Sequence, residues 1–223
     1  MAGTITALVA QKKDPNRVNV YLDGKFAFGL AAIEAIKLKR GQVLSEADIA
    51  RLQSADDVEK ARGKALRFLS NRPRSEWEVR QNLQKAGYEA GTIDQVLERL
   101  RGVGLLDDAA FVRYWIDNRM QFKPRGALAL RQELRRKGVD REVIDTVLGE
   151  VDHDDGSAAT RSALAIAGRY RNLPRQAFAQ KLSTYLLRRG FDYETVRDAV
   201  NAAWIAVHAD EADLSDDFND FEG

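Results

Sequence analysis

The chain has 223 residues, 44% of them hydrophobic, and a formal net charge of +1, which is typical of a folded globular protein of one or two domains. The absence of cysteine excludes disulfides and thiolate metal sites, and no stretch approaches the roughly 20 apolar residues that span a bilayer. The first residues lack the basic and long apolar regions of a signal peptide, so we expect a cytoplasmic protein that does not bind membranes.

Residues 1–54 are expected to form a small β-rich unit with short helices. The segments TITALVA and RVNVYL are largely apolar, and Asp23-Gly24 before KFAFGL predicts a hairpin. Two helical patterns follow, AAIEAIKL and SEADIARLQ, and Ser45 and Asp48 form a variant capping box at the start of the second. So small a unit buries little by itself, so we expect it to pack on the rest of the chain or to serve as a docking module.

The sequence after this unit repeats with a period of 51 and then 52 residues. Each repeat has a Pro-Arg pair, a helical pattern and a glycine; the pairs begin at Pro73, Pro124 and Pro174, and the glycines are Gly87, Gly138 and Gly190. We expect each proline in the first turn of a helix, each glycine at the left-handed position after its end, and the acid two residues later capping the next helix. Apolar residues recur at helical spacing on both sides of each glycine.

A further helical pattern precedes each Pro-Arg pair, at about residues 56–71, 107–122 and 156–171. The sequence therefore predicts a mainly α protein whose three tandem three-helix repeats stack into an extended array. The repeats are assigned to residues 55–106, 107–152 and 153–207.

The second repeat contains an unusually basic helix, KPRGALALRQELRRKG, with six bases and one acid. Leu130 and Leu134 are expected on its buried face, with Leu128 nearby. Bases in a last helical turn complement the helix dipole, which accounts for Arg136 and Lys137 without any function but leaves Arg125 unexplained.

Bases also flank the prolines of the other repeats, where a stacked array would place them along one edge. Such an edge suits a polyanion or an acidic groove, although a solvated face over the core is the simpler alternative. Arg119 is expected to stack on an aromatic ring or to pair with an acid of a neighbouring repeat, and Glu133 to pair with Lys137. The candidate binding residues are Arg72, Arg74, Arg80, Lys85, Arg119, Lys123, Arg125, Arg131, Arg135, Arg136, Lys137, Arg175 and Arg188.

The last segment, residues 208–223, contains seven acids and no base, whereas residues 60–150 contain 19 bases and 13 acids. We expect this segment to be a disordered tail. It either competes weakly with a negatively charged partner of the repeats or only aids solubility.

Enzymatic chemistry has little support in the sequence. His153 and His208 are far apart, the DHDD segment at 152–155 is more typical of a helix cap than of a metal site, and a glycine-rich phosphate loop is absent. Trp77, in the first turn of its helix, is a weaker candidate for an exposed stacking residue. We therefore expect no catalytic site, cofactor, metal or small-molecule substrate.

Three segments, RSEWEVRQNLQKAGY, LLDDAAFVRYWIDNR and ALRQELRRKGVD, resemble the RecX family of bacterial recombination regulators. The resemblance is densest from Arg72 to Val147 and extends to about Val207. Its most specific block comprises Leu106, Asp107, Asp108, Phe111, Trp115, Arg119, Gly126, Leu130, Glu133, Leu134, Lys137 and Gly138.

The resemblance implies an array of three-helix repeats that binds the RecA recombinase, chiefly as its filament on single-stranded DNA. Such proteins lodge in the filament groove and oppose filament growth or activity, have no catalytic centre, and bind DNA directly more weakly. The expected function is therefore that of a monomeric negative modulator of RecA that limits filament growth, ATPase and strand exchange. The alternatives are a stand-alone nucleic-acid-binding repeat protein and an adaptor for another protein.

Overall fold

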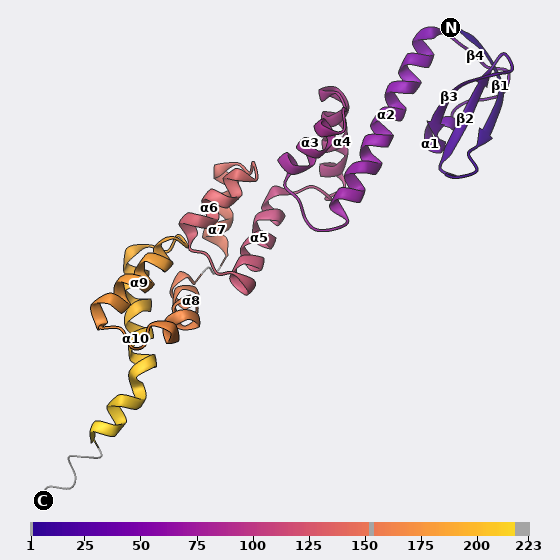
Figure 1. The fold of residues 1–223 in the computed structure, drawn as a ribbon. Coiled ribbons are helices and arrows are strands. Elements are labelled where there is room, and N and C mark those ends of the chain that lie inside the picture. Colours follow the sequence, from indigo (N-terminus) through magenta and orange to yellow (C-terminus); the bar gives the residue numbers. More distant parts are fainter. Residues whose placement is uncertain (1, 152–153, 217–223) are drawn as a thin grey trace, which may run out of the picture. The chain divides into compact units, whose positions relative to one another are not determined.

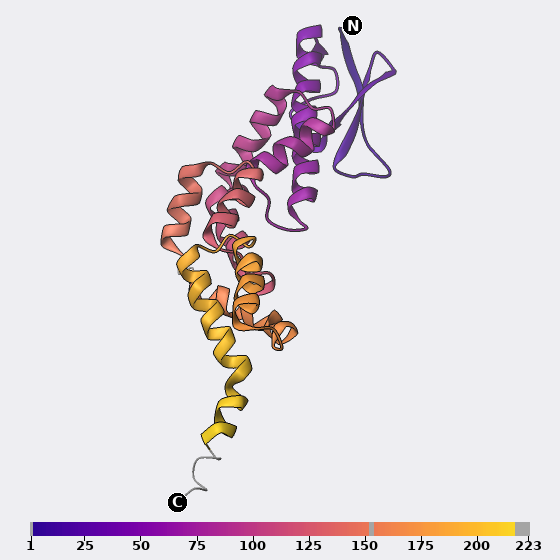
Figure 2. The ribbon, with the colours of Figure 1, turned by 60° about the vertical axis from the view of Figure 1, so that its left-hand side comes forward.

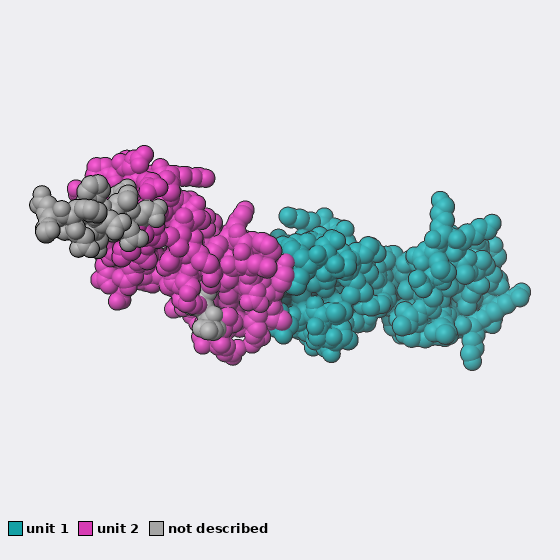
Figure 3. Space-filling model, turned by 90° about the horizontal axis from the view of Figure 1, so that it is seen from below, with its two compact units in different colours: residues 1–107 teal, residues 108–223 magenta. Residues whose placement is uncertain are grey.

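The computed structural model describes residues 2–151 and 154–216, with the side chains of the last helix described as far as Ala209. The chain divides into two compact units, residues 1–107 and 108–223, which Figure 3 shows in different colours. None of the described helices combines the length and the apolar character that crossing a bilayer requires.

The first unit begins with a four-stranded antiparallel sheet in the order β3-β2-β1-β4. A hairpin joins β2 to β3 as predicted, with Leu22 opposite Lys25. Asp23 and Gly24 form its turn with φ of 48° and 81°, the left-handed conformation that favours an Asp-Gly pair. The elements of this unit are β1 (Gly3–Ala10), β2 (Arg17–Leu22), β3 (Lys25–Ala31), α1 (Ala32–Ala35), β4 (Val43–Leu44), α2 (Glu46–Leu69), α3 (Glu76–Lys85) and α4 (Ala90–Gly102).

The sheet lies beside the first half of α2 in both ribbon views (Figure 1, Figure 2), and its inner face shares a core with that helix. Leu52 of α2 packs there with Val20 and Leu30 of the sheet. All members of this core lie within residues 1–54, so it is the core of the predicted β-rich unit itself, and α2 continues from it into the first repeat.

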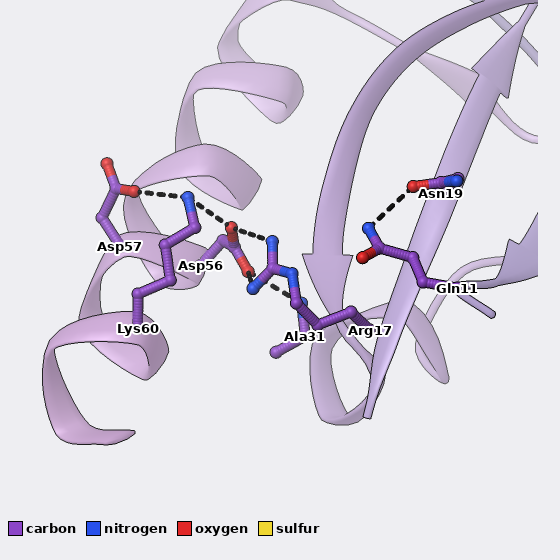
Figure 4. A network of polar contacts seen from close by, with 7 residues as sticks. All are labelled: Gln11, Arg17, Asn19, Ala31, Asp56, Asp57 and Lys60. Carbon is purple, nitrogen blue, oxygen red and sulfur yellow. Dashed lines mark hydrogen bonds and ion pairs between the residues drawn. The ribbon is translucent and has the colours of Figure 1, made fainter. Parts of the chain in front are cut away.

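A buried carboxylate reinforces this contact (Figure 4). Asp56 of α2 accepts two hydrogen bonds from the guanidinium of Arg17, at 3.2 and 3.0 Å, and one from the amide of Ala31 at 2.7 Å. The ammonium of Lys60 lies 2.8 Å from the same carboxylate. Burial raises the pKa of Asp56, but these hydrogen bonds outweigh burial and the net pKa lies below its ordinary value.

Helix α2 is one continuous helix of 24 residues, and the expectation of two separate helices meeting near residue 54 is wrong. The predicted capping box at its start is present, because Ser45 and Asp48 exchange hydrogen bonds with each other's backbone. No glycine or proline lies between Ser45 and Gly63, so no stop signal occurs near residue 54, where the prediction ended the helix.

The second unit contains only helices among its described residues. They are α5 (Asp108–Phe122), α6 (Ala127–Arg136), α7 (Arg141–Glu150), α8 (Asp155–Ala167), the 3-10 turn η1 (Gly168–Tyr170), α9 (Arg175–Leu187) and α10 (Tyr193–Asp216). Each predicted repeat has its own hydrophobic core, around Leu83 in α2–α4, Leu134 in α5–α7 and Leu186 in α8–α10. The three-helix repeats are therefore confirmed.

The stop signals of the middle helices behave as predicted. Gly87, Gly138 and Gly190 have φ of 85°, 73° and 82°. In the first repeat the amide of Tyr88 donates to the carbonyl of Leu83, and the amide of Gly87 donates to that of Gln84, which is the Schellman arrangement.

The start signals were predicted less well. The prolines lie before the helices rather than in their first turns, because Ser75 and Gly126 are the N-caps of α3 and α6, and Pro174 is itself the N-cap of α9. Asp140 and Asp192 accept hydrogen bonds from the next helix, as expected, but the side chain of Glu89 makes no such bond. A glutamate side chain is longer than the side chains that suit a cap.

The repeats of the second unit meet where α6 begins and α9 ends. The amide of Gly126 donates to the carbonyl of Arg189 at 3.0 Å, and the amide of Ala127 donates to the carboxylate of Asp155 at 3.2 Å. Gly126 has no side chain to cap α6, so the third repeat satisfies the donors at that helix end.

Helix α10 is described as far as Asp216, so the segment predicted as an acidic tail, residues 208–223, begins inside it. Residues 217–223 lie outside the described residues.

Candidate partner-binding surface

The thirteen candidate bases fall into two classes that the sequence did not separate. Seven are half-buried, and each contacts another side chain: Arg72, Arg74, Arg80, Arg119, Arg125, Arg131 and Lys137. The other six are exposed and have no ion pair with any described residue: Lys85, Lys123, Arg135, Arg136, Arg175 and Arg188.

In the first unit, three candidate bases are held close to the helices. Arg72 pairs with Glu78 at 3.0 Å, and Arg80 pairs with Asp94 at 2.7 Å. The guanidinium of Arg74 lies over the ring of Phe68, 4.1 Å from its centre. These contacts stabilise the repeat but leave part of each side chain accessible.

A single carboxylate, that of Glu133, organises the bases of the second repeat. It accepts a hydrogen bond from the indole of Trp115 at 2.9 Å and pairs with Arg119 at 2.7 Å and with Arg125 at 3.5 Å. Arg119 and Lys137 both lie over the Trp115 rings, at 4.4 and 5.1 Å. Arg119 therefore stacks as predicted, but its acid belongs to its own repeat rather than to a neighbouring one.

A second acid, Asp145 of α7, lies among three arginines. Arg131 donates to it at 2.8 Å and Arg141 at 3.4 Å, and Arg135 lines the same hollow, of about 470 Å³. The hydrogen bond from Arg131 is the main cause that holds the pKa of Asp145 below its ordinary value. Three positive charges around one negative charge leave the hollow basic. Arg141 was missed, although its spacing of four residues from Asp145 on α7 is typical of a helical ion pair.

The Pro-Arg pairs of the second unit differ in their surroundings. Arg125 lies at the contact between repeats, where it donates to the backbone carbonyl of Arg188 at 3.5 Å, whereas Arg175 is exposed. The side chain of Arg189, which was not among the candidates, donates to the carbonyl of Pro124 at 3.0 Å. Arg189 precedes Gly190 as the candidate Lys137 precedes Gly138, so its position in the repeat is a sequence signal, but only tertiary structure brings it to that loop.

The base two residues before each repeat glycine is exposed in all three repeats. Lys85 ends α3, Arg136 ends α6, and Arg188 caps α9. Each base complements the dipole of its own helix, and this alone could account for it. Their common exposure also makes them available to a partner.

Other residues singled out in the sequence add little chemistry. Trp77 is 44% exposed, as its position suggested. Asp154 caps α8 by accepting from the amide of Ser157 at 2.9 Å, whereas Asp152 and His153 lie outside the described residues. Leu128, expected near the core, is 56% exposed. No group of three or more possible metal ligands occurs in the described part of the chain.

Four family models match the chain. They are described as the Regulatory protein RecX N-terminal domain, at residues 3–45, and the first, second and third three-helix domains of RecX, at residues 61–100, 107–148 and 157–200. The similarity therefore extends into the β-rich unit.

Curated relatives called Regulatory protein RecX match most of the chain. One from Listeria monocytogenes is 33% identical over 94% of this chain and 80% of its own length, and one from Levilactobacillus brevis is 37% identical over 84% and 71%. A crystal structure titled regulatory protein RecX has a TM-score of 0.76 at 30% identity and covers 89% of this chain and 99% of that one. A RecX structure from Lactobacillus salivarius has a TM-score of 0.61 at 22% identity over 67% of this chain and 97% of that one, a likeness of fold.

Proposed function

The chain belongs to the RecX family of regulatory proteins, and from this premise we propose that it regulates the RecA recombinase by binding the RecA filament on single-stranded DNA. The expected direction of regulation is negative, with binding limiting filament growth, ATPase and strand exchange. We propose that it acts in the cytoplasm as a monomer, without a cofactor and without a catalytic step of its own.

The observation that supports this proposal most directly is the set of six exposed bases without an ion pair among the described residues, five of them in the second unit. A base held by a neighbouring acid must exchange that partner before it can bind another. A base without such a partner keeps its full charge for an acidic protein surface or a phosphate. We therefore assign partner contact to these six bases in the first place.

The seven half-buried bases are assigned a mainly structural role in this proposal. Those at Glu133 hold α5, α6 and the Pro-Arg loop together, so their removal would disturb the fold as well as binding. Arg131 is intermediate, because its ion pair with Asp145 is about 40% exposed on both sides. Exposed pairs contribute less than about 1 kcal/mol, so a partner could displace Asp145 at little cost.

Co-sedimentation tests this proposal. The full chain is mixed either with RecA filaments on single-stranded DNA or with the same DNA alone, at one salt concentration. The proposal predicts stronger binding to the filament. The stand-alone nucleic-acid-binding alternative predicts equal binding to both, and this result would replace the proposal.

A charge variant makes the test specific to the surface. Changing Arg135, Arg136 and Arg188 to glutamine should weaken filament binding by tenfold or more if each base contributes about 0.5 kcal/mol or more. A matched variant changes three exposed bases of the β-rich unit, Lys12, Lys13 and Lys25, to glutamine and removes the same charge. Equal losses in both variants would show a response to net charge rather than a surface.

A further inference from the structure

A cavity of about 320 Å³ lies where the second and third repeats meet, within the second unit. Met120 lines it from the end of α5, together with residues of the loop that follows and of α8 and α9. Because Met120 is half-buried rather than buried, a small solute that enters the cavity can reach its side chain while the chain stays folded.

Met120 carries the only internal sulfur of the chain. The sequence contains two methionines, Met1 and Met120, and no cysteine. Sulfur-containing side chains are the ones that peroxides oxidise in proteins, and the thioether of methionine is converted to a sulfoxide. An oxidant that reacts with sulfur therefore has one target beyond the first residue, and this target lies at the contact between two repeats.

The same side chain joins two hydrophobic cores. Met120 packs against the core around Leu134 in the second repeat and against the core around Leu186 in the third. Among the buried and half-buried hydrophobic residues that the structure describes, it alone belongs to both cores. A flexible, apolar thioether suits an irregular gap of this kind, which is a structural reason for methionine here. A sulfoxide is polar and does not suit it.

Cationic donors line the cavity as well. Arg161 is exposed, and Arg189 donates to the carbonyl of Pro124 at 3.0 Å, a bond that connects the third repeat to the loop before α6. A thioether sulfur is only a weak acceptor. A sulfoxide oxygen accepts hydrogen bonds strongly, so it would compete with the Pro124 carbonyl for the guanidinium of Arg189. Oxidation would thus weaken the apolar and the polar part of this contact together.

We propose that Met120 is a reversible oxidation site that loosens the contact between the second and third repeats. Hydrogen peroxide transfers one oxygen atom to the sulfur, which loses two electrons as the O–O bond breaks. The released hydroxide takes the proton of the transferred hydroxyl and leaves as water. A methionine sulfoxide reductase reverses the change with two thiols, which form a disulfide while the oxygen leaves as water. This inference goes beyond the regulation of RecA, since the reaction needs no RecA.

Peroxide treatment of the folded full chain tests the site. Peptide mass spectrometry should find the mass of one added oxygen atom at Met120, at a rate within about tenfold of that of a methionine in a short peptide under the same conditions. Treatment with a methionine sulfoxide reductase and a dithiol should remove this mass.

Hydrogen exchange of the oxidised chain tests the effect on the contact. The amide of Gly126 donates to the carbonyl of Arg189 across the two repeats, so its protection should fall by about tenfold or more when Met120 is oxidised. The amide of Val139 donates to the carbonyl of Leu134 within the second repeat and should keep its protection. Reduction of the sulfoxide should restore the protection of Gly126.

Two variants of Met120 separate oxidation from other effects of peroxide. Met120→Leu keeps an apolar side chain of similar volume, so the exchange of Gly126 should no longer respond to peroxide. Met120→Gln places a polar group of similar length there and should lower the protection of Gly126 without peroxide. The matched control is Leu164→Gln, which adds the same amide to α8 at a residue that is 44% exposed and does not line the cavity. This control should leave the exchange of Gly126 unchanged.

Three outcomes would overturn the proposal. Met120 that is oxidised only in urea, when the chain unfolds, would show that the cavity does not admit peroxide. Unchanged protection of Gly126 after complete oxidation would show that the sulfoxide is accommodated without loosening the contact. Equal losses of protection at Gly126 and Val139 would show general unfolding of the second repeat. All three measurements are made without RecA, so they leave the co-sedimentation test of the proposed function independent.

Discussion

The Cα of Gly126 lies so close to the backbone of Gly190 that a Cβ there would overlap the carbonyl oxygen of Gly190 and would lie 2.5 Å from the amide nitrogen of Phe191. The start of α6 and the end of α9 therefore meet backbone to backbone. Gly126 has an ordinary φ of −71°, so the requirement for glycine here comes from this approach and not from a left-handed conformation.

Gly126→Ala should therefore separate the two repeats and destabilise the chain by about 1–3 kcal/mol, the usual cost of overpacking. The control is Gly149→Ala in α7, where a Cβ meets no other atom within 4 Å and alanine is the better helix former. Urea denaturation of both variants measures the difference. Equal stability of the two variants would mean that the close approach is not formed in solution.

The core of the second repeat offers a sharper contrast between two leucines of α6. Leu134 is fully buried, so Leu134→Ala should cost about 2–5 kcal/mol of unfolding free energy. Leu128, expected near the core from the sequence, is 56% exposed, and Leu128→Ala should cost less than about 0.5 kcal/mol. Thermal or urea denaturation of both variants tests which face of α6 is buried, and similar losses would contradict the register.

Asp56 should make the β-rich unit sensitive to acid. Its pKa in the folded chain lies below the ordinary value of 3.8, so its contribution to stability is complete above that pH and is lost as the pH falls through the lower folded value. The Ala31 amide, which donates to this carboxylate, should lose protection from hydrogen exchange over the same range. A protection factor of this amide, relative to its intrinsic exchange rate at each pH, that does not change between pH 5 and pH 2 would contradict the assignment.

Asp56→Ala should remove the network at neutral pH as well. It leaves Arg17 and the Ala31 amide without their acceptor. The free energy of unfolding should fall by about 3 kcal/mol, which is the lower end for a broken buried pair, because Lys60 is partly exposed and can be solvated instead. Asp57→Ala is the control, because Asp57 pairs with the same lysine from an exposed position. Hydrogen exchange of the β2–β3 amides measures both.

The sequence predicted those features of the fold that depend on neighbouring residues. The left-handed glycine at Gly138 and the hairpin at Asp23-Gly24 each follow from local backbone preference and were found as expected. The break expected near residue 54 was wrong because periodicity alone does not show where one helix gives way to another.

The sequence predicted which bases belong to the candidate surface, but not which of them pair with an acid of another helix. Arg131 and Arg135 lie one turn apart on α6 and looked equivalent, yet Arg131 pairs with Asp145 of α7 whereas Arg135 has no ion pair in the described part of the chain. Which base meets an acid depends on how α6 and α7 pack, which composition and spacing do not determine.

Asp145→Asn tests whether the bases around it contribute to partner binding. Without the carboxylate, Arg131 and Arg141 lose their acid and the hollow becomes more positive. Under the proposed function, filament affinity should rise a few-fold at low salt, and the gain should shrink as salt increases. Asp117→Asn makes the same charge change at an exposed position of α5 and should have less effect. Equal gains in both variants would point to net charge alone.

The central claim is that this chain restrains RecA through exposed bases of its repeats, and the single-stranded-DNA-dependent ATPase of RecA tests it most directly. Added during filament assembly, the full chain should lower the ATPase rate, and the variant with Arg135, Arg136 and Arg188 changed to glutamine should lower it much less. The control with Lys12, Lys13 and Lys25 changed to glutamine should act like the unchanged chain. An ATPase rate that the full chain leaves unaltered, or that all three proteins lower equally, would contradict the account.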